Sequence, residues 1–124
     1  MPSKNLNILL ADDEDEIASL VSSVLIRAGH SVDLASDGQA ALDLLKDNPA
    51  RYDLIITDSN MPAVSGLELI EYLRKTGYPG KIILLSGYAA DLEKEYKILN
   101  IDRIMQKPFA FADLIGAVKE ATSA

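Results

Sequence analysis

The sequence contains no cysteine and a single histidine, His30. Without cysteine the chain can form neither a disulfide framework nor a thiolate nucleophile, and one histidine excludes a histidine-rich zinc site. A Ser-His triad could use only His30, which follows Ala28 and Gly29 at a predicted helix end and is more typical of a loop. The sequence therefore favours none of the catalytic classes that depend on these residue types.

Long apolar segments are also missing. No stretch approaches the roughly 18 apolar residues that a membrane-spanning helix needs. Residues 1–5 lack the apolar core of a secretory signal. We therefore expect a cytoplasmic protein that does not bind membranes.

Acidic residues outnumber basic ones by 19 to 12, which gives a formal net charge of -7. This charge repels nucleic acid and anionic membranes unless a basic patch overrides it, and the sequence has no such patch. A length of 124 residues, with 48% apolar and 25% charged, predicts one globular domain over residues 1–124. Direct nucleic-acid binding is therefore not expected.

Short apolar runs alternate with longer segments of helical periodicity, which is typical of a parallel sheet with crossover helices. The predicted strands are 6–10, 31–35, 54–56, 82–85 and 103–105. Helices are predicted between 15 and 29, between 37 and 49, between 67 and 77, over 92–100 and around 114–118. We therefore predict an α/β fold of flavodoxin-like (βα)5 type, a doubly wound sheet of five parallel strands in the order 2-1-3-4-5.

Charged and hydroxyl side chains follow the predicted strands at the edge where such folds bind ligands. Asp12 and Asp13 follow the first strand and Asp58 follows the third, so three carboxylates should crowd one crevice. Because each negative charge raises the pKa of the neighbouring carboxyl groups, we expect a cation to compensate the three carboxylates. Mg2+ is a better candidate than Ca2+, because it binds through one or two carboxylates, keeps several waters and can also bind phosphate oxygens. Lys107 and Ser86, after the fifth and fourth strands, could each bind a phosphoryl oxygen.

Each of these residues taken alone has a simpler interpretation. An aspartate after a strand is commonly a turn former or helix cap, and Lys107 and Ser86 would be ordinary surface and turn residues. Their joint placement at the ends of four strands favours a functional site instead.

The chain resembles the receiver domain of two-component response regulators over essentially its whole length. The matching motifs are Asp12-Asp13, Asp58 with Met61-Pro62 and Gly66, Ser86-Gly87, and Lys107-Pro108-Phe109. The resemblance implies that Asp58 accepts a phosphoryl group from a phosphohistidine of a sensor histidine kinase or a histidine phosphotransfer protein. It further implies a stand-alone, single-domain receiver that acts on a downstream protein target or output domain.

The resemblance also implies the roles of the other site residues. Asp13, Asp58 and the backbone carbonyl of Asn60 would hold Mg2+ directly, and Asp12 would reach it through water. Ser86 and Lys107 would bind phosphoryl oxygens, and the Lys107–Pro108 peptide bond is expected to be cis.

Three positions are predicted to set the lifetime and the output of the phosphorylated state. Asn60 and Tyr88, each two residues beyond a site residue, are expected at the rim of the site, where they would shield the acyl phosphate from water. Ile104 occupies the position where the family usually has a tyrosine or phenylalanine that couples to Ser86. Because Ile104 has no ring to swing, we predict a weakened switch, or one rerouted through Gly87 to Ala90 and the following helix.

Three other functions fit the sequence less well than a receiver does. An aspartyl-phosphate phosphohydrolase would need an aspartate two residues after the nucleophile, where this chain has Asn60. A flavin carrier would need a phosphate-binding loop where residues 12–15 are all acidic. A receiver-like scaffold that is never phosphorylated would typically have lost an acidic or lysine position. We therefore predict a signalling domain that catalyses only its own phosphorylation and dephosphorylation, and is otherwise not an enzyme.

Overall fold

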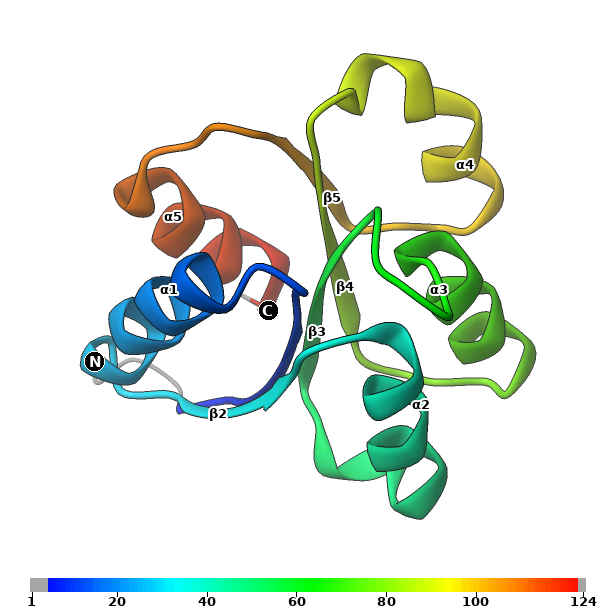
Figure 1. Ribbon diagram of the computed structural model, residues 1–124, viewed down its shortest axis with the longest axis horizontal. Helices are drawn as coiled ribbons and strands as arrows, with labels where there is room; N and C mark the ends of the chain where they lie inside the picture. The colour runs from blue at the N-terminus through cyan, green and yellow to red at the C-terminus, as the bar shows by residue number, and fades with distance from the viewer. Residues whose placement is uncertain (1–4, 123–124) are drawn as a thin grey trace.

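The computed structural model describes residues 5–122, which form a central parallel sheet covered by helices on both faces (Figure 1). The strands are β1 Asn7–Ala11, β2 Ser31–Ala35, β3 Leu54–Asp58, β4 Lys81–Ser86 and β5 Arg103–Gln106. The helices are α1 Asp15–Arg27, α2 Gly38–Asp47, α3 Gly66–Lys75, α4 Glu93–Ile98 and α5 Phe111–Thr122, with 3-10 turns η1 Pro49–Arg51 and η2 Ala89–Leu92. The strand order β2-β1-β3-β4-β5 confirms the predicted doubly wound fold.

Two hydrophobic cores lie on opposite faces of the sheet, because successive residues of a strand point to opposite sides. Leu10 and Ile56 pack in the core beneath α1 and α5, while Leu9 and Ile55 pack in the core beneath α2 and α3. The central strands β1, β3 and β4 are therefore almost continuously apolar, as the sequence indicated.

The fourth helix, predicted over about 92–100, is shorter than expected at both ends. The segment begins with the 3-10 turn η2, and the α-helix proper covers only Glu93–Ile98, none of whose residues is buried. The segment ends where Asn100 adopts a left-handed conformation with φ 51°. A short polar helix has no apolar face to define its limits, so periodicity could not place them.

Arg74 of α3 forms hydrogen bonds to the residues that follow α4. Its guanidinium donates to the carbonyl oxygens of Leu99 at 2.9 Å, Asn100 at 2.7 Å and Tyr78 at 3.3 Å. These carbonyls include helix-end groups that lack an intrahelical partner. The end of α4 that leads into β5 is thus held by a charged side chain.

His30 lies in the loop after α1, where the sequence placed it. Its Nδ1 accepts the backbone N–H of Leu6 at 3.1 Å and so ties this loop to the residue before β1. The histidine therefore has a structural partner in the loop.

Within the part of the chain that the structure describes, no helix is both long enough and apolar enough to cross a membrane.

Gly66, the first residue of α3, lies directly against the end of β3. A Cβ on Gly66 would overlap the backbone carbonyl of Asp58, whereas a Cβ on Gly116, exposed in α5, would meet nothing within 4 Å. Gly66→Ala should lower the free energy of unfolding by about 1–3 kcal/mol through overpacking. Gly116→Ala should raise it by about 0.5–1 kcal/mol, because alanine loses less conformational freedom in a helix.

Urea unfolding of both glycine variants measures these changes. Gly116→Ala is the matched control, since it adds the same methyl group to a helix without a steric clash. Equal effects in the two variants would contradict the close approach of α3 to Asp58.

Candidate functional site

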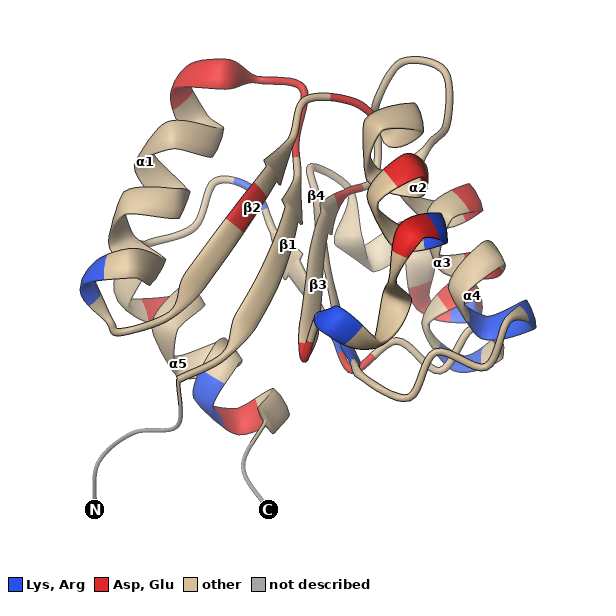
Figure 2. Ribbon diagram, turned by 90° about the horizontal axis from the view of Figure 1, so that it is seen from below, with Lys and Arg blue, Asp and Glu red and all other residues tan. Residues whose placement is uncertain are grey.

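The carboxyl ends of four neighbouring strands place the predicted site residues at one edge of the sheet. Asp12 follows the last residue of β1, Asp58 and Ser86 end β3 and β4, and Lys107 follows β5. Figure 2 shows acidic residues gathered at the edge to which the strand arrows point. Parallel pairing in register therefore brings together residues that lie far apart in the sequence.

The ammonium group of Lys107 lies among three carboxylates. Its Nζ is 3.1 Å from Asp58 Oδ1, 3.4 Å from Glu14 Oε1 and 3.9 Å from Asp12 Oδ2. The Lys107 side chain is only 19% exposed and that of Asp58 only 8% exposed, so water screens this pair weakly. The lysine therefore compensates one of the three negative charges around it and leaves the edge with a surplus of carboxylate charge.

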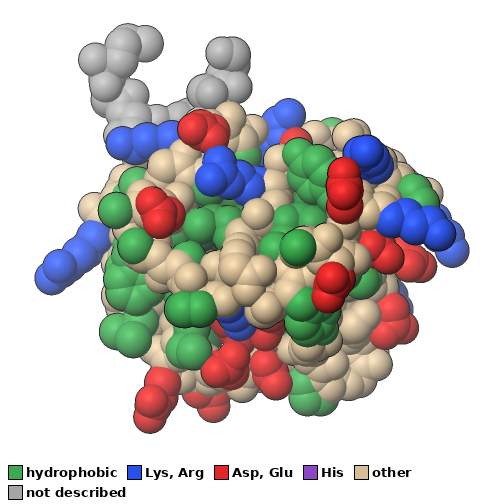
Figure 3. Space-filling view, turned by 90° about the horizontal axis from the view of Figure 1, so that it is seen from above, with side chains coloured by type: hydrophobic (Ala, Val, Ile, Leu, Met, Phe, Trp, Pro, Cys, Tyr) green, Lys and Arg blue, Asp and Glu red, His purple; other side chains and the backbone are tan. Residues whose placement is uncertain are grey.

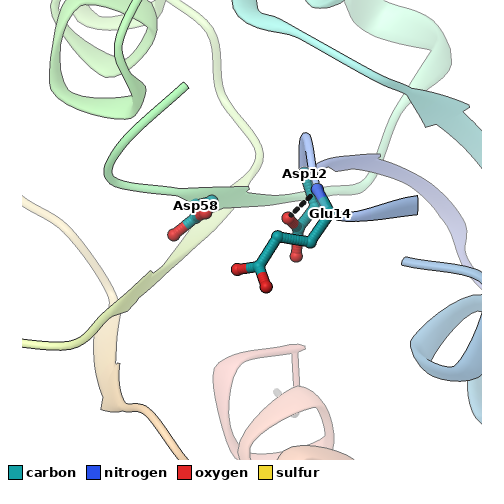
Figure 4. Close-up of side chains that lie close together, drawn as sticks. All are labelled: Asp12, Glu14 and Asp58. Atoms are coloured by element: carbon teal, nitrogen blue, oxygen red, sulfur yellow. Dashed lines mark hydrogen bonds between the residues drawn. The ribbon is translucent and has the colours of Figure 1, made fainter. Parts of the chain in front are cut away.

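Asp12, Glu14 and Asp58 each point a carboxylate oxygen toward the same small region, and these oxygens lie within 4.8 Å of one another (Figure 4). Asp12 is buried, and its Oδ1 accepts the Glu14 N–H at 2.9 Å. Its Oδ2 is buried without a hydrogen-bond partner. A buried carboxylate oxygen that accepts no hydrogen bond, beside two further carboxylates, fits a hard divalent cation such as Mg2+.

An open cavity of about 360 Å3 lies over this cluster. Its walls are Asp13, Glu14, Asp58, Ser59, Asn60, Gly87, Tyr88 and Lys107. The cavity is thus lined by Asp13, predicted as a metal ligand, and by Asn60 and Tyr88, predicted at the rim. Sequence reasoning missed Glu14, although its position at the start of α1, two residues past Asp12, could have indicated that it reaches the same edge.

Ser86 is buried at the end of β4, and its Oγ accepts the backbone N–H of Tyr88 at 3.1 Å. Tyr88 itself is 41% exposed at the mouth of the cavity. The Ser86 hydroxyl therefore organises the loop after β4. The Lys107–Pro108 peptide bond is cis, as the resemblance implied.

Ile104 lies away from the carboxylates, half-buried on β5. It packs against the α2 and α3 core and lines a separate hollow of about 940 Å3 between α4, β5 and α5. Figure 3 shows this face, on which hydrophobic and charged side chains are mixed. Ile104 therefore lines a different hollow from the one that the charged residues line.

A family model described as the response regulator receiver domain matches residues 8–119. The chain belongs to this family. The receiver is 32% identical to part of the aerobic respiration control sensor protein ArcB of Escherichia coli K12, covering 97% of this chain and 16% of that protein. It is 34% identical to part of the transcriptional regulatory protein CpxR of the same organism, covering 90% and 47%. The chain thus spans less than half the length of these relatives.

Solved receiver structures have the same fold. The Francisella response regulator 1452 receiver domain matches with a TM-score of 0.86 and 31% identity, covering 94% of this chain and 96% of that one. The Thermotoga maritima response regulator TrrA, solved in complex with Mg2+ and BeF, matches with a TM-score of 0.81 and 35% identity, covering 93% and 97%. Chemotaxis protein CheY4 of Vibrio cholerae matches with a TM-score of 0.85 and 29% identity, covering 95% and 99%.

The charges at the receiver's acidic edge alter the pKa of each main group. Burial raises the pKa of the Asp58 carboxyl, the positive charge of Lys107 partly offsets the rise, and the charge of Asp13 adds to it. Burial also raises the pKa of Asp12, against the hydrogen bond from the Glu14 N–H. For Lys107, burial lowers the pKa, but the neighbouring carboxylates outweigh burial and leave the pKa raised. A further cation at this edge would stabilise the ionised carboxylates.

Asp58→Asn should raise the free energy of unfolding at pH 7. The pKa of Asp58 is higher in the folded chain than its ordinary value of 3.8, so ionisation of this carboxyl destabilises the folded state. As the pH falls toward 3.8, Asp58 takes up a proton in the folded state at a higher pH than in the unfolded state. The wild type is then stabilised, and the difference in free energy of unfolding between Asp58→Asn and the wild type should shrink. Urea unfolding of both proteins in metal-free buffer over a pH series measures the difference.

Glu71→Gln, which removes an exposed carboxylate on α3, is the control for a general effect of net charge. It should not reproduce the stabilisation. An advantage of Asp58→Asn that persisted unchanged down to pH 3.8 would contradict the raised pKa of Asp58.

Proposed function

We propose that this receiver is the phosphoacceptor of a two-component phosphorelay, with Asp58 as the reacting residue. The observation that carries the proposal is the Asp58 carboxylate at the base of an open cavity, 3.1 Å from the Lys107 ammonium. An Asp58 oxygen would form the new P–O bond while the N–P bond of a phosphohistidine breaks and its electron pair stays on the imidazole nitrogen. The donor would be a sensor histidine kinase or a histidine phosphotransfer protein.

Lys107 and Ser86 would stabilise the transferred phosphoryl group. The Lys107 ammonium already contacts Asp58, and a small displacement from Glu14 would bring it to a phosphoryl oxygen. The Ser86 hydroxyl would turn from the Tyr88 N–H to donate to a second oxygen. Phosphoryl transfer asks the protein chiefly for such alignment and charge stabilisation.

Asp13, Asp58 and the backbone carbonyl of Asn60 would hold Mg2+ directly, with Asp12 acting through water. Bound Mg2+ would supply positive charge that offsets the negative charge of the phosphoryl oxygens. The position of Asp13 and Asn60 in the cavity wall supports this ligand set. Glu14 belongs to the tightest carboxylate cluster but also pairs with Lys107, so we assign it to holding the lysine before phosphorylation.

The receiver would act as a self-modifying signalling domain and not as an enzyme with a separate substrate. Its phosphorylated state would alter contacts with a downstream protein target or output domain. Ile104 would transmit this change weakly, because an aliphatic side chain already packed against the core has no ring to move.

Incubation with Mg2+ and acetyl phosphate, followed by intact-mass measurement, tests the proposed function. We expect the mass of one added phosphoryl group, lost in Asp58→Asn and strongly reduced in Asp13→Asn or when EDTA replaces Mg2+. Glu71→Gln should be phosphorylated like the wild type. Absence of the added mass in the wild-type protein would instead favour a scaffold that is never phosphorylated, and persistent turnover of a phosphorylated substrate would favour a phosphohydrolase.

The exposed side chains of Asn60 and Tyr88 should set the lifetime of phosphorylated Asp58. Both line the mouth through which a water must approach the phosphorus in line with the Asp58 oxygen. Asn60→Ala and Tyr88→Ala should each change the hydrolysis rate constant severalfold, measured by loss of the phosphoryl mass after removal of acetyl phosphate. The idea fails if both variants retain the wild-type half-life. Tyr96→Ala, at an exposed tyrosine that does not line this cavity, is the control.

A further inference from the structure

Gln106, the last residue of β5, binds the loop after β4 through its side-chain amide. Its Nε2 donates to the carbonyl oxygen of Gly87 at 2.6 Å and to that of Lys107 at 2.9 Å. Its Oε1 accepts the N–H of Ala89 at 2.9 Å. The Gln106 amide thus uses both of its N–H donors and its acceptor, and it binds the loop at Gly87 and at Ala89, on either side of Tyr88.

These hydrogen bonds replace a helix cap that the residues of the loop do not provide. Ala89 is the first residue of η2, and the residue before it, Tyr88, provides no side-chain cap. The backbone N–H groups at the start of a helical turn need an acceptor from outside. For Ala89 that acceptor is Gln106, and for Tyr88 it is the Ser86 hydroxyl. Two side chains from the ends of β4 and β5 therefore determine the position of the loop.

Leu92, the last residue of η2, is buried in the core beneath α2 and α3 and anchors the segment there. Ahead of Leu92, no residue of the loop from Gly87 to Asp91 is buried. In α4 itself, no residue is buried. The far end of α4 is fixed by the Arg74 guanidinium. A displacement of the segment should therefore occur at the loop end, where Gln106 opposes it.

We propose that Gln106 is a positioning residue that restrains the loop from Gly87 to Ala90 in the unphosphorylated arrangement. The inference rests on the proposed function, in which the Ser86 hydroxyl leaves the Tyr88 N–H to bind the phosphoryl group. The loop can follow that change only if two hydrogen bonds lengthen or break: the one that Gln106 donates to the Gly87 carbonyl and the one that it accepts from the Ala89 N–H. Gln106 therefore contributes to the free-energy difference between the unphosphorylated and the phosphorylated conformation. Ile104 has no ring that could move and so would not supply this control.

Removal of the amide should make the phosphorylated conformation easier to reach. In Gln106→Met, which keeps the length of the side chain, beryllofluoride in the presence of saturating Mg2+ should bind roughly three- to tenfold more tightly than in the wild type. Each neutral hydrogen bond of this kind contributes about a factor of two to ten to a conformational equilibrium. The amide resonances of residues 87–90 in the free variant should shift toward their positions in the beryllofluoride-bound wild type. Titration followed by amide chemical shifts measures both quantities.

Gln39→Met is the matched control, because the chain contains only these two glutamines. Gln39 also donates a side-chain hydrogen bond, to Asp43 on the exposed surface of α2. This control should bind beryllofluoride as the wild type does. Gln106→Ala, as a second variant, should change the affinity in the same direction as Gln106→Met, which separates the loss of hydrogen bonds from new packing by the thioether.

The outcomes separate the two proposals. If the wild type binds beryllofluoride but both Gln106 variants bind it equally or more weakly, the restraint is wrong and the proposed function stands. Opposite effects of the methionine and alanine variants would also overturn it. If the wild type neither binds beryllofluoride nor accepts a phosphoryl group at Asp58, the proposed function is wrong and the restraint falls with it.

Discussion

The contact between the Lys107 ammonium and the Asp58 carboxylate is the interaction around which the charged edge of this domain is arranged. It joins the end of β5 to the end of β3 across β4, so it forms only if the parallel strands pair in register. Glu14 and Asp12 add negative charge that a single lysine does not balance. This surplus of carboxylate oxygens makes the edge suitable for a divalent cation and for the chemistry of a phosphoryl group.

Away from the carboxylates, a small number of contacts hold the segment that follows β4. Ser86 and Gln106 hold the loop after β4 through backbone groups, and Arg74 holds the far end of α4. Between these attachments, in residues 87–98, Leu92 is the one buried residue, so the position of the segment depends on this side chain and on a few hydrogen bonds. Structural elements with few apolar contacts are those that shift at low free energy.

Much of the fold could be predicted because buried parallel strands have a strong sequence signal. The continuous apolar runs of β3 and β4 marked their positions, although β3 runs on to include Asp58 itself. The fourth helix was misplaced because its residues are exposed and its limits come from Asn100 and from tertiary hydrogen bonds. Glu14 was overlooked because an acidic residue at the start of a helix usually has a local explanation.

The sequence by itself determined the doubly wound architecture, the edge at which Asp12, Asp58, Ser86 and Lys107 gather, and the family. Hydrophobic periodicity and the placement of polar residues after apolar strands are local properties, so they can be recognised in the sequence alone. Only the tertiary structure decided that Glu14 shares Lys107 with Asp58, that Asp12 Oδ2 is buried without a hydrogen bond, and that Gln106 binds the loop on both sides of Tyr88. Such contacts depend on side-chain direction and on distances between residues far apart in the chain, which no local pattern encodes.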